Sequence, residues 1–244
     1  MYYEKPIKLN NGTTKMVAHR GFRMVEVENT IQAFNLATNC AVYGIENDVH
    51  LTKDGKFIVI HDHDLKRLAG IEGKIIEEMT FDECRAVALL NKEGVADGNY
   101  HMPTVEEYIT ACKLGGKQAI LEIKHIDFEN SKRLAILVND LGYIDNTTFI
   151  AFQKYSLEGV RDAFPTASVQ YLTTDFDIDL IPLLVKNKWD LDIEYKALTK
   201  ERIDALHELG ITINCWTVNE KDVAELLVYW GVDMITSDIF EANN

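Results

Sequence analysis

The sequence predicts an α/β protein: a (β/α)8 TIM barrel with a small insertion after its second strand. Three observations predict this fold. Strand-like apolar runs alternate with helix-like runs almost to the end of the chain. The strand-like runs are rich in Ile and Val and mostly lack alternation with polar residues, which suits parallel strands buried on both faces. Eight such units in 244 residues fit a compact closed barrel better than an open sheet.

Each element is expected from its own local pattern. Strands are expected at residues 15–19, 44–50, 118–124, 147–152, 168–172, 189–193, 212–218 and 233–236. Helices are expected between them, at residues 29–39, 105–113, 130–140, 156–164, 179–187, 199–209 and 219–230. Polar residues that can cap helix N-termini stand at Asn29, Thr104, Ser156, Thr199 and Asn219. Glycines follow three helix ends, at Gly142, Gly210 and Gly231.

One segment, residues 64–100, breaks this rhythm. It is mixed, charged and contains glycine, with a short helix expected at 80–90 and a loop at 91–99. We interpret it as an insertion that lies over the top of the barrel. The whole chain, residues 1–244, is expected to form one domain, because a barrel of this size is routinely a single domain.

Composition limits the classes of function. The formal net charge of −14 disfavours nucleic acids and anionic membranes as partners. No apolar run approaches the ~18 residues of a membrane span, and the first six residues lack a signal-peptide pattern, so we expect a soluble, cytoplasmic protein without stable membrane insertion. The four cysteines lie far apart, which favours free thiols. Both a monomer and a dimer remain open.

A β-hairpin is expected to return the chain to the second strand. Asp54-Gly55 lies between two β-rich runs and is typical of a two-residue type I′ turn. With those two residues as the loop, counting outward pairs His50 with Val59 and Asp48 with His61. A slip of one residue would move His61 to the other face.

Three carboxylates are expected at the C-terminal ends of barrel strands, where active residues of such barrels gather. Glu46 and Asp48 point the same way along one strand, and Glu122 interrupts another apolar strand. Buried acids repel one another unless they are neutralised. All-oxygen ligation suits a hard cation, Mg²⁺ or Ca²⁺. The alternative is that these acids only pair with Arg20, Lys124 or other bases.

Two histidines and two bases are expected beside these acids. Taken singly, each of His19 and His61 is better explained as a core histidine; together they suit a general acid and base pair. Arg20 and Lys124 supply cationic donors that fit the oxygens of a phosphate. Ion pairing with the acids is compatible with that role.

Two further features allow more than one interpretation. Trp216 is expected either as a pocket wall for an apolar or polyol group or as core packing. His61 and His63 have the His-x-His spacing of zinc hydrolases, but in barrel amidohydrolases that motif ends the first strand, whereas here it follows the hairpin.

Several motifs in fixed order resemble the glycerophosphodiester phosphodiesterase family. They are His19-Arg20-Gly21, Glu28-Asn29-Thr30-Ile31-Gln32-Ala33-Phe34, Glu46-Asn47-Asp48-Val49, Thr52-Lys53-Asp54-Gly55, His61-Asp62, Pro103-Thr104-Val105-Glu106-Glu107, Leu121-Glu122-Ile123-Lys124 and Trp216-Thr217-Val218-Asn219. The tripeptide His-Arg-Gly alone is weak evidence for this resemblance. The ordered set of motifs covers most of the chain and is highly specific for the family.

The resemblance implies a TIM barrel and metal-dependent hydrolysis of a small glycerol phosphodiester to glycerol 3-phosphate and an alcohol. Site residues are implied as well: an acid and base pair (His19, His61), metal ligands (Glu46, Asp48, Glu122) and phosphate contacts (Arg20, Lys124). The chain departs from the family pattern at Val27, where proline is common, and at Ala151-Phe152, where Ser-Phe is frequent. Only the second departure is expected to alter the pocket.

Two competing functions stay open. One is a lipid-directed phosphodiesterase of the lysophospholipase D type on the same scaffold, and the other is a non-catalytic binder of phosphorylated ligands. A long apolar groove in the insertion would favour the lipid substrate, but the insertion is short and charged. The intact set of acids and histidines argues against a mere binder.

Overall fold

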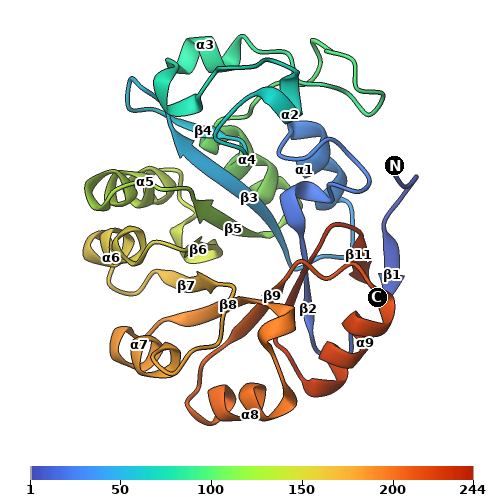
Figure 1. Ribbon diagram of the computed structural model, residues 1–244, viewed down its shortest axis with the longest axis vertical. Coiled ribbons are helices and arrows are strands. Elements are labelled where there is room, and N and C mark those ends of the chain that lie inside the picture. Colours follow the sequence, from blue (N-terminus) through green and yellow to red (C-terminus); the bar gives the residue numbers. More distant parts are fainter. Residues whose placement is uncertain (1, 244) are drawn as a thin grey trace.

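The computed structural model describes residues 2–243 and shows a closed barrel of eight parallel strands (Figure 1). These strands are β2 (Lys15–Ala18), β3 (Gly44–Leu51), β5 (Gln118–Ile123), β6 (Thr147–Ala151), β7 (Ser168–Thr173), β8 (Asp190–Glu194), β9 (Ile213–Trp216) and β10 (Met234–Ser237). The ring closes because β2 pairs with both β10 and β3. The predicted (β/α)8 fold is confirmed; residues 1 and 244 of the expected domain lie outside the described residues.

Helices cover the outside of the barrel (Figure 1). They are α1 (Ile31–Thr38), α4 (Val105–Gly115), α5 (Phe128–Asp140), α6 (Lys154–Ala163), α7 (Leu180–Asn187), α8 (Lys200–Glu208) and α9 (Lys221–Trp230). Outside the ring, β1 (Ile7–Leu9) pairs in parallel with β11 (Phe240–Ala242), two strands that the sequence pattern did not indicate. No helix within residues 2–243 is both long enough and apolar enough to cross a membrane.

The helix caps show where local signals were overridden. Thr199 caps α8 as predicted, and Thr104 forms a capping box at α4. The caps of three other helices are instead Thr30, Gln153 and Glu220. The cap oxygens of the two asparagines are occupied, because Asn29 Oδ1 accepts from the Asp48 amide at 3.4 Å and Asn219 Oδ1 accepts from the Asp238 amide at 2.9 Å. Ser156 lies inside α6 and donates to the Ile126 carbonyl. All three predicted terminal glycines have positive φ.

The predicted register of the hairpin is wrong by one residue. Strand β4 (Phe57–Val59) pairs antiparallel with β3, and His50 lies opposite Ile58 rather than Val59. The loop contains three residues, Lys53 to Gly55, of which only Gly55 has a positive φ (73°). The Thr52 hydroxyl stabilises this loop by accepting a hydrogen bond from the Lys56 backbone amide at 3.0 Å. The expected pairing of Asp48 with His61 is therefore replaced by a hydrogen bond from the Ile60 amide to the Asp48 carbonyl.

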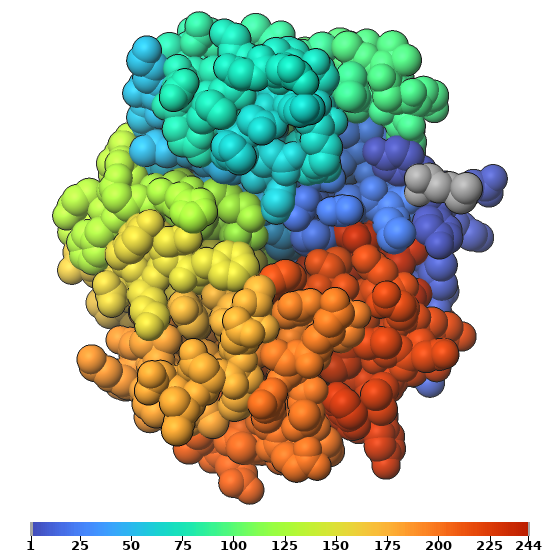
Figure 2. All heavy atoms as spheres, viewed as in Figure 1, coloured from blue at the N-terminus to red at the C-terminus, as the bar shows by residue number. Residues whose placement is uncertain are grey.

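The insertion forms its own lobe at one end of the molecule, the upper end in Figure 2. It contains two short helices, α2 (Lys66–Ala69) and α3 (Phe81–Arg85), so the helix expected over 80–90 ends early. Its hydrophobic cluster, which includes Leu65, Ile76 and Met102, packs against Ile58 of β4. Within residues 2–243, no insertion residue lines the cavity at the strand ends, so the segment lies beside the barrel mouth rather than over it.

Two clusters of apolar side chains form the core around and inside the barrel. The larger one lies between strands and helices, and a smaller cluster of Val17, Ile120, Ile150, Leu172 and Met234 comes from strands on several sides of the ring. Residues two positions along a strand share a face. The inner cluster therefore lies directly below the side chains that follow it, such as Glu122 after Ile120.

Gly159 in α6 marks a close approach between two helices. A Cβ at this position would lie 2.3 Å from the carbonyl oxygen of Phe128 in α5. We expect Gly159→Ala to lower the free energy of unfolding by about 1–3 kcal/mol in urea denaturation, although alanine normally favours a helix. The exposed neighbour Glu158→Ala serves as control, and equal stability of the two variants would contradict this packing.

Candidate active site

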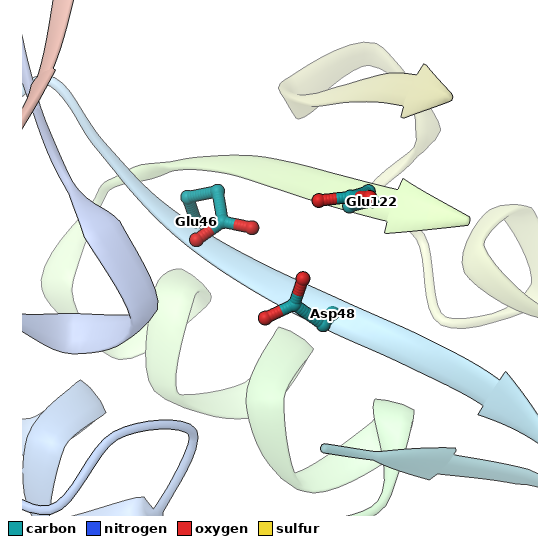
Figure 3. Close-up of side chains that lie close together, drawn as sticks. All are labelled: Glu46, Asp48 and Glu122. Atoms are coloured by element: carbon teal, nitrogen blue, oxygen red, sulfur yellow. The ribbon is translucent and has the colours of Figure 1, made fainter. Parts of the chain in front are cut away.

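Three acidic side chains converge between the middle of β3 and the C-terminal end of β5 (Figure 3). Glu46 and Asp48 lie two residues apart on β3, and Asp48 stands directly opposite Glu122 on β5. One oxygen from each of the three lies within 4.8 Å of the others, and all three residues are buried. This is the only such metal-ligating group within residues 2–243, and it does not include His63.

Two bases contact the same acids. Lys124 Nζ lies 3.0 Å from Asp48 Oδ1 and 2.6 Å from Glu122 Oε1. Arg20 Nε lies 3.2 Å from Asp48 Oδ2, and the Arg20 backbone amide donates to Glu46 Oε2 at 2.9 Å. The ion pairing considered from the sequence is thus present. Two cations facing three carboxylates still leave an excess of negative charge.

Burial and these neighbours separate the pKa values of the three acids. Burial and the nearby Asp48 raise the pKa of Glu46 well above its usual range. Burial also raises the pKa of Glu122 to about 7, against the opposing effect of Lys124. For Asp48, Lys124 and Arg20 outweigh burial and hold the pKa well below its usual range.

His19 follows β2 in a short 3-10 turn (His19–Gly21) whose left-handed Arg20 (φ 50°) turns the chain back toward the site. Its Nδ1 lies 2.6 Å from Asp238 Oδ1, and Asn219 donates to the other oxygen of that carboxylate at 2.7 Å. Its Nε2 lies 3.9 Å from Glu46 Oε2. Because an ionised Asp238 only accepts, the proton of neutral His19 resides on Nδ1 and its Nε2 is free to accept one.

His61 reaches the site from the bend after β4, beyond the last paired residue, which is why the register slip does not turn it away. Its Nδ1 lies 2.7 Å from Asp62 Oδ1. Burial lowers the pKa of His61 to about 4, so this imidazole is neutral at pH 7. Both histidines therefore have the same arrangement, with Nδ1 held by a carboxylate and Nε2 left for chemistry.

A chain of ion pairs runs from His61 to Arg20, which contacts the buried carboxylate of Asp48. Asp62 accepts from Arg67 Nε at 2.7 Å and from Nη2 at 2.9 Å. Arg67 donates to both oxygens of Glu28 at 2.8 Å, and Arg20 Nη1 donates to Glu28 Oε1 at 2.8 Å. We call Asp62, Arg67, Glu28 and Arg20 the ion-pair chain. It connects the insertion to the loop that carries His19.

The site contains one cavity of about 190 Å³. His19, Arg20, His61 and Lys124 line it together with Glu46 and Glu122. The remaining wall is more apolar and is formed by Ile150, Phe152, Leu172, Asp192, Trp216, Thr217 and Thr236. Phe152 and Trp216 meet edge to face, with ring centroids 5.9 Å apart. Trp216 is thus a wall of the cavity, as is Phe152 where the chain departs from the family pattern.

Sequence reasoning missed several residues of this site. Asp238 was not indicated, although it closely follows β10 and strand ends are where such residues gather. Glu28 and Arg67 were not indicated as a pair, because their contact joins segments 39 residues apart. Asp192 was hidden in the alternating run of β8.

Comparisons with known proteins agree in pointing to one family. Residues 19–242 match the family described as Glycerophosphoryl diester phosphodiesterase family. A glycerophosphodiester phosphodiesterase of Caldanaerobacter subterraneus is 27% identical, with 92% of this chain and 94% of that protein covered. One of Bacillus altitudinis is 28% identical, with the same coverage.

Solved structures of similar proteins have the same fold. A phosphodiesterase of Oleispira antarctica in complex with the product sn-glycerol-3-phosphate has a TM-score of 0.83 at 20% identity and covers 93% of both chains. A glycerophosphodiester phosphodiesterase of Parabacteroides distasonis has a TM-score of 0.75 at 29% identity and covers 94% of both.

Proposed function

The chain belongs to the glycerophosphoryl diester phosphodiesterase family, and we propose that His19 and His61 form the proton-transfer pair with which it hydrolyses glycerophosphodiesters to glycerol 3-phosphate and an alcohol. The observation that carries the proposal is their shared arrangement. Each imidazole is held at Nδ1 by a carboxylate, and both line one cavity with Glu46 and Glu122. General acid and base groups need this combination of fixed orientation and a free nitrogen.

We propose that Glu46, Asp48 and Glu122 hold a divalent cation, Mg²⁺ or Ca²⁺. Their oxygens lie close enough to share one ion, and the adjacent Lys124 and Arg20 leave part of the negative charge uncompensated. Carboxylate oxygens are the ligands that these hard ions prefer. When bound, the cation would withdraw charge from the phosphoryl oxygens.

The residues of the chain then divide the reaction between them. One histidine accepts the proton of the glycerol hydroxyl next to the phosphate, and the hydroxyl oxygen attacks phosphorus. The other histidine must first take up a proton at its Nε2, which it then donates to the departing alcohol; this leaves a cyclic phosphate that water opens with the proton transfers reversed. Arg20 and Lys124 line the same cavity and supply donors to the phosphate oxygens.

The cavity supports small headgroups over lipids as substrates. Its lining within residues 2–243 includes nothing from the insertion, where an apolar groove would have to lie. The net charge of −14 disfavours nucleic acid as a partner. The four cysteines are free thiols, which supports work in a reducing compartment such as the cytoplasm.

Release of glycerol 3-phosphate from a panel of glycerophosphodiesters tests this proposal. We expect activity on choline, ethanolamine and glycerol headgroups, a fall of at least about tenfold after EDTA treatment, and recovery with Mg²⁺ or Ca²⁺. Activity indifferent to EDTA would contradict the cation site. Recovery with Zn²⁺ alone would favour the His-x-His alternative, and a preference for lysophospholipids would favour the lipid-directed one.

A further inference from the structure

Asp192 is a buried acid in the cavity that the proposed chemistry does not use. It lies on β8, is 1% exposed and lines the apolar part of the cavity. Within residues 2–243, its Oδ1 has no hydrogen-bond partner. Nearby Asn214 and Thr236 hydrogen-bond to each other, with the Asn214 amide donating to the Thr236 hydroxyl at 3.0 Å.

Trp216 carries a buried hydrogen-bond donor in the same cavity. It lies on β9, the strand next to β8, and lines the same cavity. Its indole Nε1, a donor only, is buried and also lacks a partner within the described residues. A buried acceptor and a buried donor without partners are costly to keep, and in folded proteins they call for a specific reason.

A hydroxyl group carries both kinds of partner that these two atoms lack. Its oxygen can accept from the Trp216 N–H, and its proton can be donated to Asp192. An ammonium group has only donors and would leave the Trp216 N–H unpaired. Burial and the nearby Glu122 raise the pKa of Asp192 well above its usual range, against the opposing effect of Asn214.

On the basis of the proposed function, we propose that Asp192 and Trp216 bind the terminal hydroxyl of the substrate's glycerol, the one farthest from the phosphate. The glycerol end is the same in every substrate, whereas the alcohol varies in size and must leave. A deep subsite among buried side chains fits the constant end. Asp192 is then a specificity-determining residue that makes the enzyme prefer glycerol over shorter diols.

Two matched substrates test this assignment. One is a glycerophosphodiester, and the other carries propane-1,2-diol in place of glycerol, so that it keeps the attacking hydroxyl but lacks the terminal one. We expect the wild-type enzyme to favour the first by at least about tenfold in kcat/KM, because the second leaves buried polar groups unpaired. Asp192→Leu should remove most of that preference, and Asp192→Asn should keep part of it.

Asp190→Asn is the matched control. Asp190 has the same orientation on β8, but it accepts the Thr212 backbone amide at 2.8 Å and lies outside the cavity lining. This variant should keep the full preference for glycerol. Melting temperature provides a second measurement, because replacing an unpartnered buried acid by leucine should not lower it.

The outcomes separate the inference from the proposed function. No hydrolysis of either substrate by the wild-type enzyme would contradict the proposed function. Equal kcat/KM on both substrates, with glycerol 3-phosphate released, would overturn the inference alone. Equal losses on both substrates in Asp192→Leu, with a lower melting temperature, would assign Asp192 a structural role and overturn it too. If Asp192→Leu altered only the preference between ethanolamine and propanol headgroups, the subsite would lie on the alcohol side instead.

Discussion

Replacing either cavity histidine by alanine, in His19→Ala or His61→Ala, is expected to lower kcat at least about 10²-fold, the usual scale for general acid and base groups. The fold should survive both changes. Asp238 keeps its hydrogen bond from Asn219, and Asp62 keeps its two contacts with Arg67. The measurement is steady-state release of glycerol 3-phosphate at saturating metal, with circular dichroism to verify folding.

His63→Ala provides the matched control for this pair. His63 lies two residues from His61, but its side chain is 70% exposed and is absent from the lining of the cavity. We expect near wild-type kcat in this variant. Near-full activity in either His19→Ala or His61→Ala would remove that residue from the proton-transfer pair, and a large loss in His63→Ala would revive the zinc alternative.

Removing the charge of Glu28 is expected to produce the largest loss of stability. Glu28 is 6% exposed and accepts hydrogen bonds from both Arg20 and Arg67. Glu28→Gln removes the carboxylate shared by Arg20 and Arg67, although Asp48 and Asp62 still face these two guanidiniums; breaking a buried charge pair in this way costs up to about 3–5 kcal/mol. Urea denaturation at pH 7 measures this loss. Glu225→Gln, which affects only an exposed pair with Lys221, should cost no more than about 0.5 kcal/mol.

The effect of Glu28 should also depend on pH. Its contacts with Arg67 and Arg20 overcome burial and lower its pKa from 4.5 to about 2 in the folded state. A lowered folded-state pKa stabilises the protein fully above the unfolded value, and this contribution disappears as pH falls toward the folded value. The difference between wild type and Glu28→Gln should therefore be smaller at pH 3 than at pH 7. An unchanged difference would show that the charge is not its source.

The fold was largely predictable because its signals are periodic and local. Eight apolar runs separated by helix-like runs give the barrel without knowledge of any long-range contact. The errors arise where tertiary contacts outweigh local preference. Asn29 fails as a cap because its amide binds Asp48, and the hairpin register shifts because Thr52 stabilises a three-residue loop.

The site was predictable only in part, for a related reason. Glu46, Asp48 and Glu122 stand out because charge interrupts apolar strands, and the structure brings them together. Asp238 and Arg67 look like ordinary surface residues until the chain folds. Their importance lies in partners distant in sequence, which no local pattern records.

The ion-pair chain makes the orientation of His61 depend on the insertion. It joins Arg67 of the insertion to Arg20 beside the first barrel strand, and it holds Asp62, which orients His61. The insertion has its own hydrophobic cluster, separate from the core of the barrel. In the part of the chain that the structure describes, a segment that contributes no side chain to the lining of the cavity therefore still helps to position a residue of the proposed proton-transfer pair.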